Sequence, residues 1–149
     1  MTDATRRNVE AAFVGEAKAY FRLLAFAEKA QEEGYPQVAR LFRSVAAAEA
    51  VHAKSHFELL EKVRSTEENL KLSFEKETFV NEVAYPAFLK QAWADEDKLS
   101  IWYFTKARNA EERHAHLYKL AIADMASEKE TKYFVCSYCG WVETVARPE

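Results

Sequence analysis

The chain has 149 residues, of which 49% are apolar, so it can bury the core of one ordinary domain together with a small appendage. It holds only three glycines and three prolines, a scarcity that argues against a turn-rich all-β fold. The net charge is −3, from 21 basic and 24 acidic residues that are well mixed, which argues against a nucleic-acid partner and a polybasic membrane patch. No apolar run approaches the ~20 residues that span a bilayer, and the polar N-terminus lacks a secretory signal, so we expect a cytoplasmic protein without a membrane partner.

Four helical segments are expected along the chain. The first ends at Gly34, a residue type common just beyond helix C-termini, and the second starts at Pro36, which suits a first helical position. Pro86 lies inside the third and should kink it, because proline removes a backbone donor and crowds the preceding turn. Asp95 or Asp97 can cap the fourth. The expected helices cover about residues 5–33, 36–63, 73–94 and, after this cap, up to 127, with a polar connection at 64–72.

The C-terminal tail carries a Cys-x-x-Cys pair. Cys136 and Cys139 are flanked by short β-prone stretches at 133–135 and 141–142, which predicts a small β-rich knuckle. In a reducing compartment such a pair indicates metal ligands or redox thiols rather than a structural disulfide. We therefore expect a four-helix domain at 1–130 and a knuckle at 131–149.

An internal repeat gives the first functional signal. The segment Ala48-Glu49-Ala-Val-His52-Ala53 reappears 62 residues later as Ala110-Glu111-Glu-Arg-His114-Ala115. Each copy follows a glutamate on the preceding helix, Glu16 or Glu77, by about 33 residues. Two similar helical hairpins, each with one Glu and one Glu-x-x-His, are the simplest description.

The polar residues of this repeat fall on the apolar stripes of their helices, where positions recur at spacings of three and four. Burying four carboxylates without compensation costs several kcal/mol per ion, so a positive charge must lie among them. Two divalent cations would neutralise them, and a Glu and a His at i and i+3 share one helix face. The predicted metal ligands are Glu16, Glu49, His52, Glu77, Glu111 and His114.

Taken singly, these signals are weak, because a lone Glu-x-x-His on a helix is more often an exposed pair than a ligand pair. The repeated set is much more specific. One Glu from each of two helices plus Glu-x-x-His from each of the other two is the ligand set of di-iron carboxylate bundles. Imidazole and carboxylate also suit manganese or zinc. The sequence therefore predicts two bound metal ions, most simply iron, with zinc or manganese as alternatives.

Further motifs agree with this pattern. They are Phe13-Val-Gly15-Glu16, Glu33-Gly34-Tyr35 with Ala39-Arg-Leu-Phe42, Glu77-Thr-Phe, Tyr85-Pro86-Ala-Phe88 and Cys136-Ser-Tyr-Cys139-Gly140-Trp141. With them the chain resembles the rubrerythrins of the ferritin-like superfamily over almost its whole length. The resemblance implies an all-α ferritin-like four-helix bundle and a di-iron centre that receives electrons from a rubredoxin-like Fe(Cys)4 site. It also implies reduction of hydrogen peroxide to water.

Three features depart from the family pattern. Rubrerythrins usually carry another glutamate where this chain has Val80, and without it His52 should stay a ligand in both oxidation states. A tyrosine common near the first-helix glutamate is replaced by Leu23, so Tyr85 is the phenol expected near the metals. The tail has one Cys-x-x-Cys where a rubredoxin-like site needs two, so Cys136 and Cys139 alone cannot complete a four-coordinate iron or zinc site. A shortened chain, thiolates from another chain and weak metal binding remain as explanations.

The connection between the second and third helices bears on assembly. In the ferritin-like topology these helices run parallel, so Glu49 and Glu77 should lie at the same height with only 28 positions between them. Closing that path within one chain needs a taut loop of roughly ten residues, since helix rises about 1.5 Å and extended chain at most about 3.3 Å per residue. We therefore expect a swapped homodimer in which two chains share each bundle. The alternative is an unswapped bundle with a stretched loop.

Three functions are compatible with these residues. The first is an enzyme, a non-haem di-iron peroxidase of oxidative-stress defence, with Tyr85 as donor of a proton or hydrogen bond and a rubredoxin/reductase system as electron source. The second is oxidation of iron by dioxygen, as in ferritins, because the ligand set without a carboxylate at Val80 resembles theirs. The third is a metal-binding or electron-carrying protein with little turnover.

Overall fold

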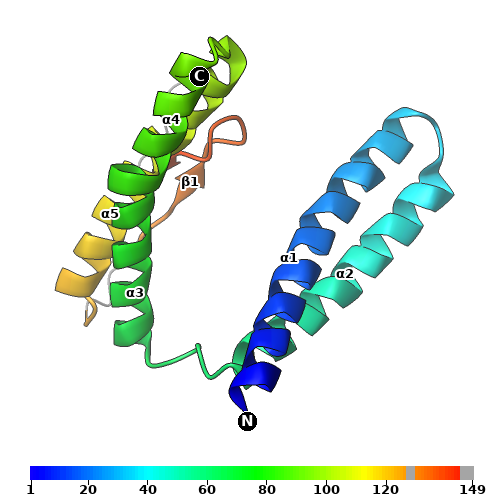
Figure 1. The fold of residues 1–149 in the computed structure, drawn as a ribbon, viewed down its shortest axis with the longest axis horizontal. Coiled ribbons are helices and arrows are strands. Elements are labelled where there is room, and N and C mark those ends of the chain that lie inside the picture. Colours follow the sequence, from blue (N-terminus) through cyan, green and yellow to red (C-terminus); the bar gives the residue numbers. More distant parts are fainter. Residues whose placement is uncertain (127–129, 145–149) are drawn as a thin grey trace. The chain divides into compact units, whose positions relative to one another are not determined.

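The structure, a computed structural model, describes residues 1–126 and 130–144 (Figure 1). Contacts within the chain divide it after Arg64 into two compact units, 1–64 and 65–149. Each unit is built around a pair of antiparallel helical segments, which confirms the predicted all-α architecture of four helices. Among the described residues, no helix is both long enough and apolar enough to cross a bilayer. The predicted boundary at residue 130 stays a prediction.

The first unit is a hairpin of α1 (Asp3–Glu32) and α2 (Pro36–Leu59). The Thr2 side chain caps α1 by accepting a hydrogen bond from the Thr5 amide. Gly34 has a φ of +82°, a left-handed conformation that suits glycine and that turns the chain between the helices. α1 and α2 then lie side by side along their lengths, as Figure 1 shows in blue and cyan. Both predicted helices are confirmed, although α2 ends four residues earlier than expected.

Small side chains line the seam of this hairpin. On α2 and at its C-cap, Ala39, Ala46, Ala53 and Leu60 recur every seven residues and are at most 8% exposed. Alanine lets the two helices approach closely, but it buries little apolar area. Aromatic rings flank the seam, as Phe13 of α1 and Phe57 of α2 do with centroids 5.0 Å apart, whereas Phe21 keeps 70% of its surface exposed. Apolar surface of this extent favours association with further helices.

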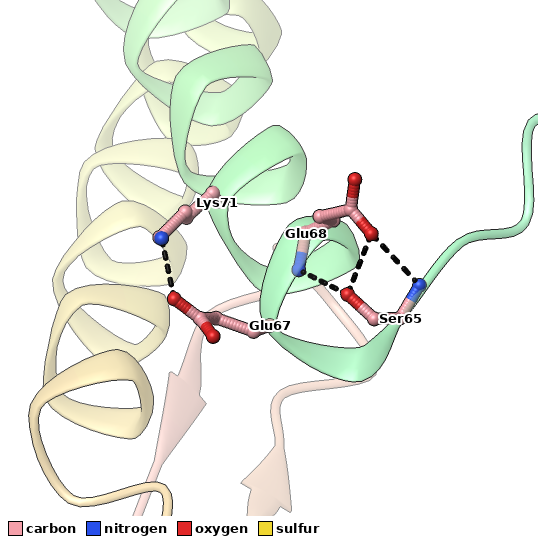
Figure 2. A network of polar contacts seen from close by, with 4 residues as sticks. All are labelled: Ser65, Glu67, Glu68 and Lys71. Atoms are coloured by element: carbon pink, nitrogen blue, oxygen red, sulfur yellow. Dashed lines mark hydrogen bonds and ion pairs between the residues drawn. The ribbon is translucent and has the colours of Figure 1, made fainter.

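The second unit begins with α3 (Thr66–Phe79), and Figure 2 shows how its start is fixed. The Ser65 hydroxyl accepts from the Glu68 amide, and the Glu68 carboxylate accepts from the Ser65 amide and hydroxyl. One turn on, Glu67 pairs with Lys71. The expected start near residue 73 was therefore wrong by seven positions, because a capping box and an i,i+4 ion pair stabilise a polar first turn.

A π turn interrupts the second unit's first helical segment. α3 passes into the π-helix η1 (Val80–Ala84) and then into α4 (Tyr85–Ala94), with the Tyr85 amide donating to the Val80 carbonyl. Pro86 follows at once; it lacks an N–H and its ring would crowd a regular α-turn. The distortion expected at this proline thus takes the form of a widened turn. Such π turns occur frequently at functional sites.

The remaining elements complete the second unit. α5 (Lys98–Ala123) is capped by Asp97, one of the two residues predicted as its cap. The Asp97 carboxylate accepts hydrogen bonds from the amides at 99 and 100. α3 and α4 both pack against α5. The strands β1 (Phe134–Val135) and β2 (Val142–Glu143) pair antiparallel, and β2 contacts α5. The predicted β-rich knuckle is confirmed. α5 ends at Ala123, four residues before the predicted end at 127, a position that itself lies outside the described residues.

Candidate metal centre

The first unit brings three predicted ligands together. Glu16 on α1 and Glu49 and His52 on α2 each offer one ligand atom, and these atoms lie within 4.8 Å of one another. His52 Nδ1 is 3.1 Å from Glu49 Oε2, as expected for residues three apart on a helix. The His52 side chain is 58% exposed and that of Glu49 21%. This triad is therefore open on its histidine side.

The second unit repeats the arrangement with more cover. Glu77 on α3 and Glu111 and His114 on α5 have ligand atoms within 4.8 Å of one another. His114 Nδ1 is 2.9 Å from Glu111 Oε2, and the two side chains are 24% and 22% exposed. The structure thus groups the six residues into two sets of three, one in each unit. Each set matches the Glu plus Glu-x-x-His pattern of the repeat.

Each triad depends both on the geometry of one helix and on the packing of two helices. A Glu-x-x-His places two ligands on one face because the helix turns every 3.6 residues. The third ligand comes from the neighbouring antiparallel helix. In the first unit its height is set by the alanine seam, where Ala19 of α1 and Ala46 and Ala53 of α2 are all buried.

The carboxylates of the second triad repel each other in the metal-free protein. Burial of Glu77, its hydrogen bond with Glu111 and the Glu111 charge raise the pKa of Glu77 to about 7, while the His114 charge acts in the opposite direction. A proton is thus retained where two carboxylates meet. A divalent cation satisfies the same need with a larger charge, and the donor set of two carboxylates and an imidazole suits iron, manganese or zinc. The residues present therefore fit a metal ion.

We expect metal-free Glu77→Gln to be more stable than the metal-free wild type at about pH 8 and equally stable below pH 4.5, the ordinary pKa of glutamate. The folded wild type binds a proton at Glu77 between its ordinary pKa of 4.5 and about 7, so its free energy of unfolding falls as the pH rises through this window. Glutamine stays neutral throughout. Urea unfolding across this pH range measures the difference, with the exposed Glu75→Gln as control. Parallel pH profiles for wild type and Glu77→Gln would contradict the expectation.

Tyr85 lies in the electrostatic field of this triad. Burial and the negative charges of Glu111 and Glu77 raise the pKa of its phenol, so the phenol keeps its proton at neutral pH. Its ring is 5.8 Å from that of Phe88 and 6.0 Å from that of Phe104, centroid to centroid. Tyr85 therefore joins an aromatic cluster on one side and interacts with carboxylates on the other.

The knuckle lies against α5, the helix that carries Glu111 and His114. Cys136 and Cys139 line a cavity of about 520 Å³ that Lys106 of α5 also lines, and they form no disulfide in the described part of the chain. The Gly140 carbonyl, next to Cys139, accepts a hydrogen bond from His114 Nε2 at 2.9 Å. No group of three candidate ligands within the described ranges includes either cysteine. Metal binding by the cysteines stays a prediction.

Two features of this site were missed from the sequence. The π turn at Val80–Ala84 begins three residues after Glu77, and Pro86 was its only signal. Arg113, between Glu111 and His114, bonds to the knuckle through Val142 and Glu143. Its position beside a predicted ligand could have drawn attention to it.

Comparison with known proteins identifies the family. The Rubrerythrin family profile matches residues 7–122. The chain belongs to the rubrerythrin family. It is 31% identical to nigerythrin of Nitratidesulfovibrio vulgaris, with 93% of this chain and 76% of the relative aligned, and 31% identical to rubrerythrin-2 of Clostridium acetobutylicum, with 89% and 82% aligned. The solved structure described as the fully reduced, all-ferrous state of nigerythrin covers all of this rubrerythrin with a TM-score of 0.57 and 30% identity, and 81% of that chain is aligned.

Family membership supports the prediction of a di-iron centre. Rubrerythrins are ferritin-like di-iron oxidoreductases of oxidative-stress defence, and both triads of this rubrerythrin offer the carboxylates and imidazoles such a centre needs.

Proposed function

We propose that this rubrerythrin reduces hydrogen peroxide to water at a di-iron centre. The ligands are those of the two triads: Glu16, Glu49 and His52, together with Glu77, Glu111 and His114. The observation that carries the proposal is the duplicated triad, in which three ligand atoms approach within 4.8 Å twice. The raised pKa of Glu77 adds to it, because the second triad holds a proton that a cation can replace.

The chain's own residues hold the metal and supply a proton donor. When bound, the two ferrous ions provide the two electrons that cleavage of the O–O bond requires. The four carboxylates and two imidazoles would hold the two ions. The Tyr85 phenol, which stays protonated at neutral pH, donates a hydrogen bond or a proton to the departing oxygen. The neighbouring rings of Phe88 and Phe104 pack against the Tyr85 ring and help to hold the phenol in position.

Each centre is proposed to form between two chains. If α2 and α3 ran parallel in one bundle with Glu49 and Glu77 at the same height, the connection would have to run back along the bundle from Leu59 to Thr66. That distance is about 31 Å, the combined rise from Glu49 to Leu59 and from Thr66 to Glu77 at 1.5 Å per helical residue. The connection 60–65 spans at most about 25 Å when fully extended. A single chain therefore cannot bring both triads to one height without unwinding a helix, whereas a swapped homodimer can.

The electron source is proposed to be a rubredoxin/reductase system, as the family resemblance implies. Cys136 and Cys139 would bind iron or zinc with two further thiolates. Their support is the knuckle geometry, in which the Gly140 amide donates to the Cys136 carbonyl at 2.9 Å and the Cys136 amide to the Trp141 carbonyl at 2.9 Å. These bonds turn the chain tightly around the cysteine pair.

Rapid mixing of the reduced, iron-loaded protein with peroxide and, separately, with dioxygen tests the function. We expect the iron to be oxidised faster by peroxide than by dioxygen. Tyr85→Phe should slow the peroxide reaction by about 100-fold, the lower end of what a positioned acid contributes, and leave the iron content unchanged. Phe88→Tyr, which keeps the ring, is the control.

Each outcome has a clear meaning. Faster oxidation by dioxygen would favour a ferritin-like iron oxidase, and slow reaction with both oxidants would favour a metal-binding or electron-carrying protein. An unchanged peroxide rate in Tyr85→Phe would remove the phenol from the reaction.

A further inference from the structure

Arg113 joins α5 to the C-terminal knuckle. Its Nε donates to the Val142 carbonyl at 3.1 Å, and its terminal nitrogen pairs with the Glu143 carboxylate. The Arg113 side chain is 16% exposed and that of Glu143 26%. Glu143 is itself held, because it accepts a hydrogen bond from the Thr144 amide at 2.9 Å. A sheltered ion pair with a second backbone bond is a stronger anchor than an exposed pair.

The next residue along α5 bonds to the same knuckle. His114 Nε2 lies 2.9 Å from the Gly140 carbonyl, two residues before Val142. A carbonyl oxygen carries no hydrogen, so His114 Nε2 must be the donor in this bond. His114 Nδ1 faces Glu111 Oε2 at 2.9 Å, and since a carboxylate oxygen also accepts, Nδ1 is the donor of that contact in the metal-free protein. The knuckle thereby occupies Nε2, which leaves Nδ1 as the nitrogen of His114 that a cation can take over.

His52 provides an internal comparison. Its Nδ1 faces Glu49 at 3.1 Å, as in the second triad, but its side chain is 58% exposed against 24% for His114. The two triads thus have the same types of candidate ligand and differ in what surrounds the imidazole. In the second triad the knuckle provides that surrounding.

We propose that Arg113 is a positioning residue: it fastens the knuckle to α5 and so keeps His114 Nε2 bonded to the Gly140 carbonyl, with Nδ1 directed at the metal site. The guanidinium touches neither the ligand atoms nor a substrate. It acts by holding strand β2, which fixes the Gly140 carbonyl opposite His114. The anchor is independent of the proposed function, and only its effect on metal binding rests on that function.

Variants of the full-length, metal-free protein test the anchor first. Arg113→Ala should raise the alkylation rate of Cys139 about tenfold or more, because local opening follows the loss of a charge-assisted bond. The Nε2–H NMR signal of His114 should lose its protection from exchange with water, because the Gly140 carbonyl no longer holds it. Arg113→Lys, which keeps the charge, should restore part of both effects. Arg108→Ala is the matched control, because Arg108 on the same helix donates to the Asn81 carbonyl at 3.1 Å instead of to the knuckle.

Glu143→Gln covers the case in which Arg113→Ala does not fold, since it weakens the same anchor without altering α5. Zinc titration then measures the consequence, and affinity at the second triad should fall about 10- to 100-fold, as for other groups that orient a ligand. Unchanged alkylation and unchanged His114 signals in both variants would overturn the proposal. Altered signals with unchanged zinc affinity would instead support the anchor and remove His114 from the ligands.

Discussion

Glu111→Gln is expected to lower the iron bound per chain from about two ions to about one or fewer and to slow peroxide consumption more than about 100-fold, beyond the usual effect of losing a group that only orients a ligand. Glu111 approaches both His114 and Glu77, so its carboxylate is central to the second triad. Glutamine keeps the shape but removes the charge that binds the cation. Metal analysis of anaerobically prepared protein, alongside peroxide turnover, measures both effects.

The adjacent Glu112→Gln is the matched control, because Glu112 is exposed on the same helix and takes no part in the triad. It should bind iron and turn over as the wild type does. Metal should also stabilise the wild type by about 2.7 kcal/mol per site when free metal is 100 times the dissociation constant, and Glu111→Gln should lose one such increment. Full iron content in Glu111→Gln would refute the proposed ligand set.

Two inactive variants, Glu49→Gln and Glu111→Gln, are expected to restore activity when unfolded and refolded together. In a swapped mixed dimer, one bundle combines both altered triads and the other combines two intact ones. Random pairing makes about half of the dimers mixed, so about a quarter of the wild-type sites should return. Iron content and peroxide turnover of the refolded mixture measure this recovery.

An unswapped bundle predicts a different result, since every bundle would then carry one altered triad. Refolding Glu111→Gln together with Glu77→Gln is the control, because both changes lie in the second unit and no pairing creates an intact site. Recovery in this control, or none in the test mixture, would contradict the swapped dimer.

The sequence alone determined the pairing of candidate ligands within each helix. Glu49 with His52, and Glu111 with His114, lie three residues apart, and the regular helical turn brings such residues together in any context. The four helices were likewise predictable, because Gly34, Pro36 and Asp97 act on their immediate neighbours. The end of α2 and the start of α3 were not predictable. The polar residues that form the capping box of α3 resemble a loop when only hydrophobicity is considered.

Only the tertiary structure decided what surrounds each triad. The exposed fractions of His52 and His114 differ although their motifs match, because the knuckle covers one of them. The bonds from Arg113 to Val142 and Glu143 span about 30 positions. A long, flexible side chain finds its partner only after the chain has folded back, so no periodicity along the sequence encodes such a contact. The sequence therefore specified the candidate ligands, whereas packing determined how their imidazoles are held.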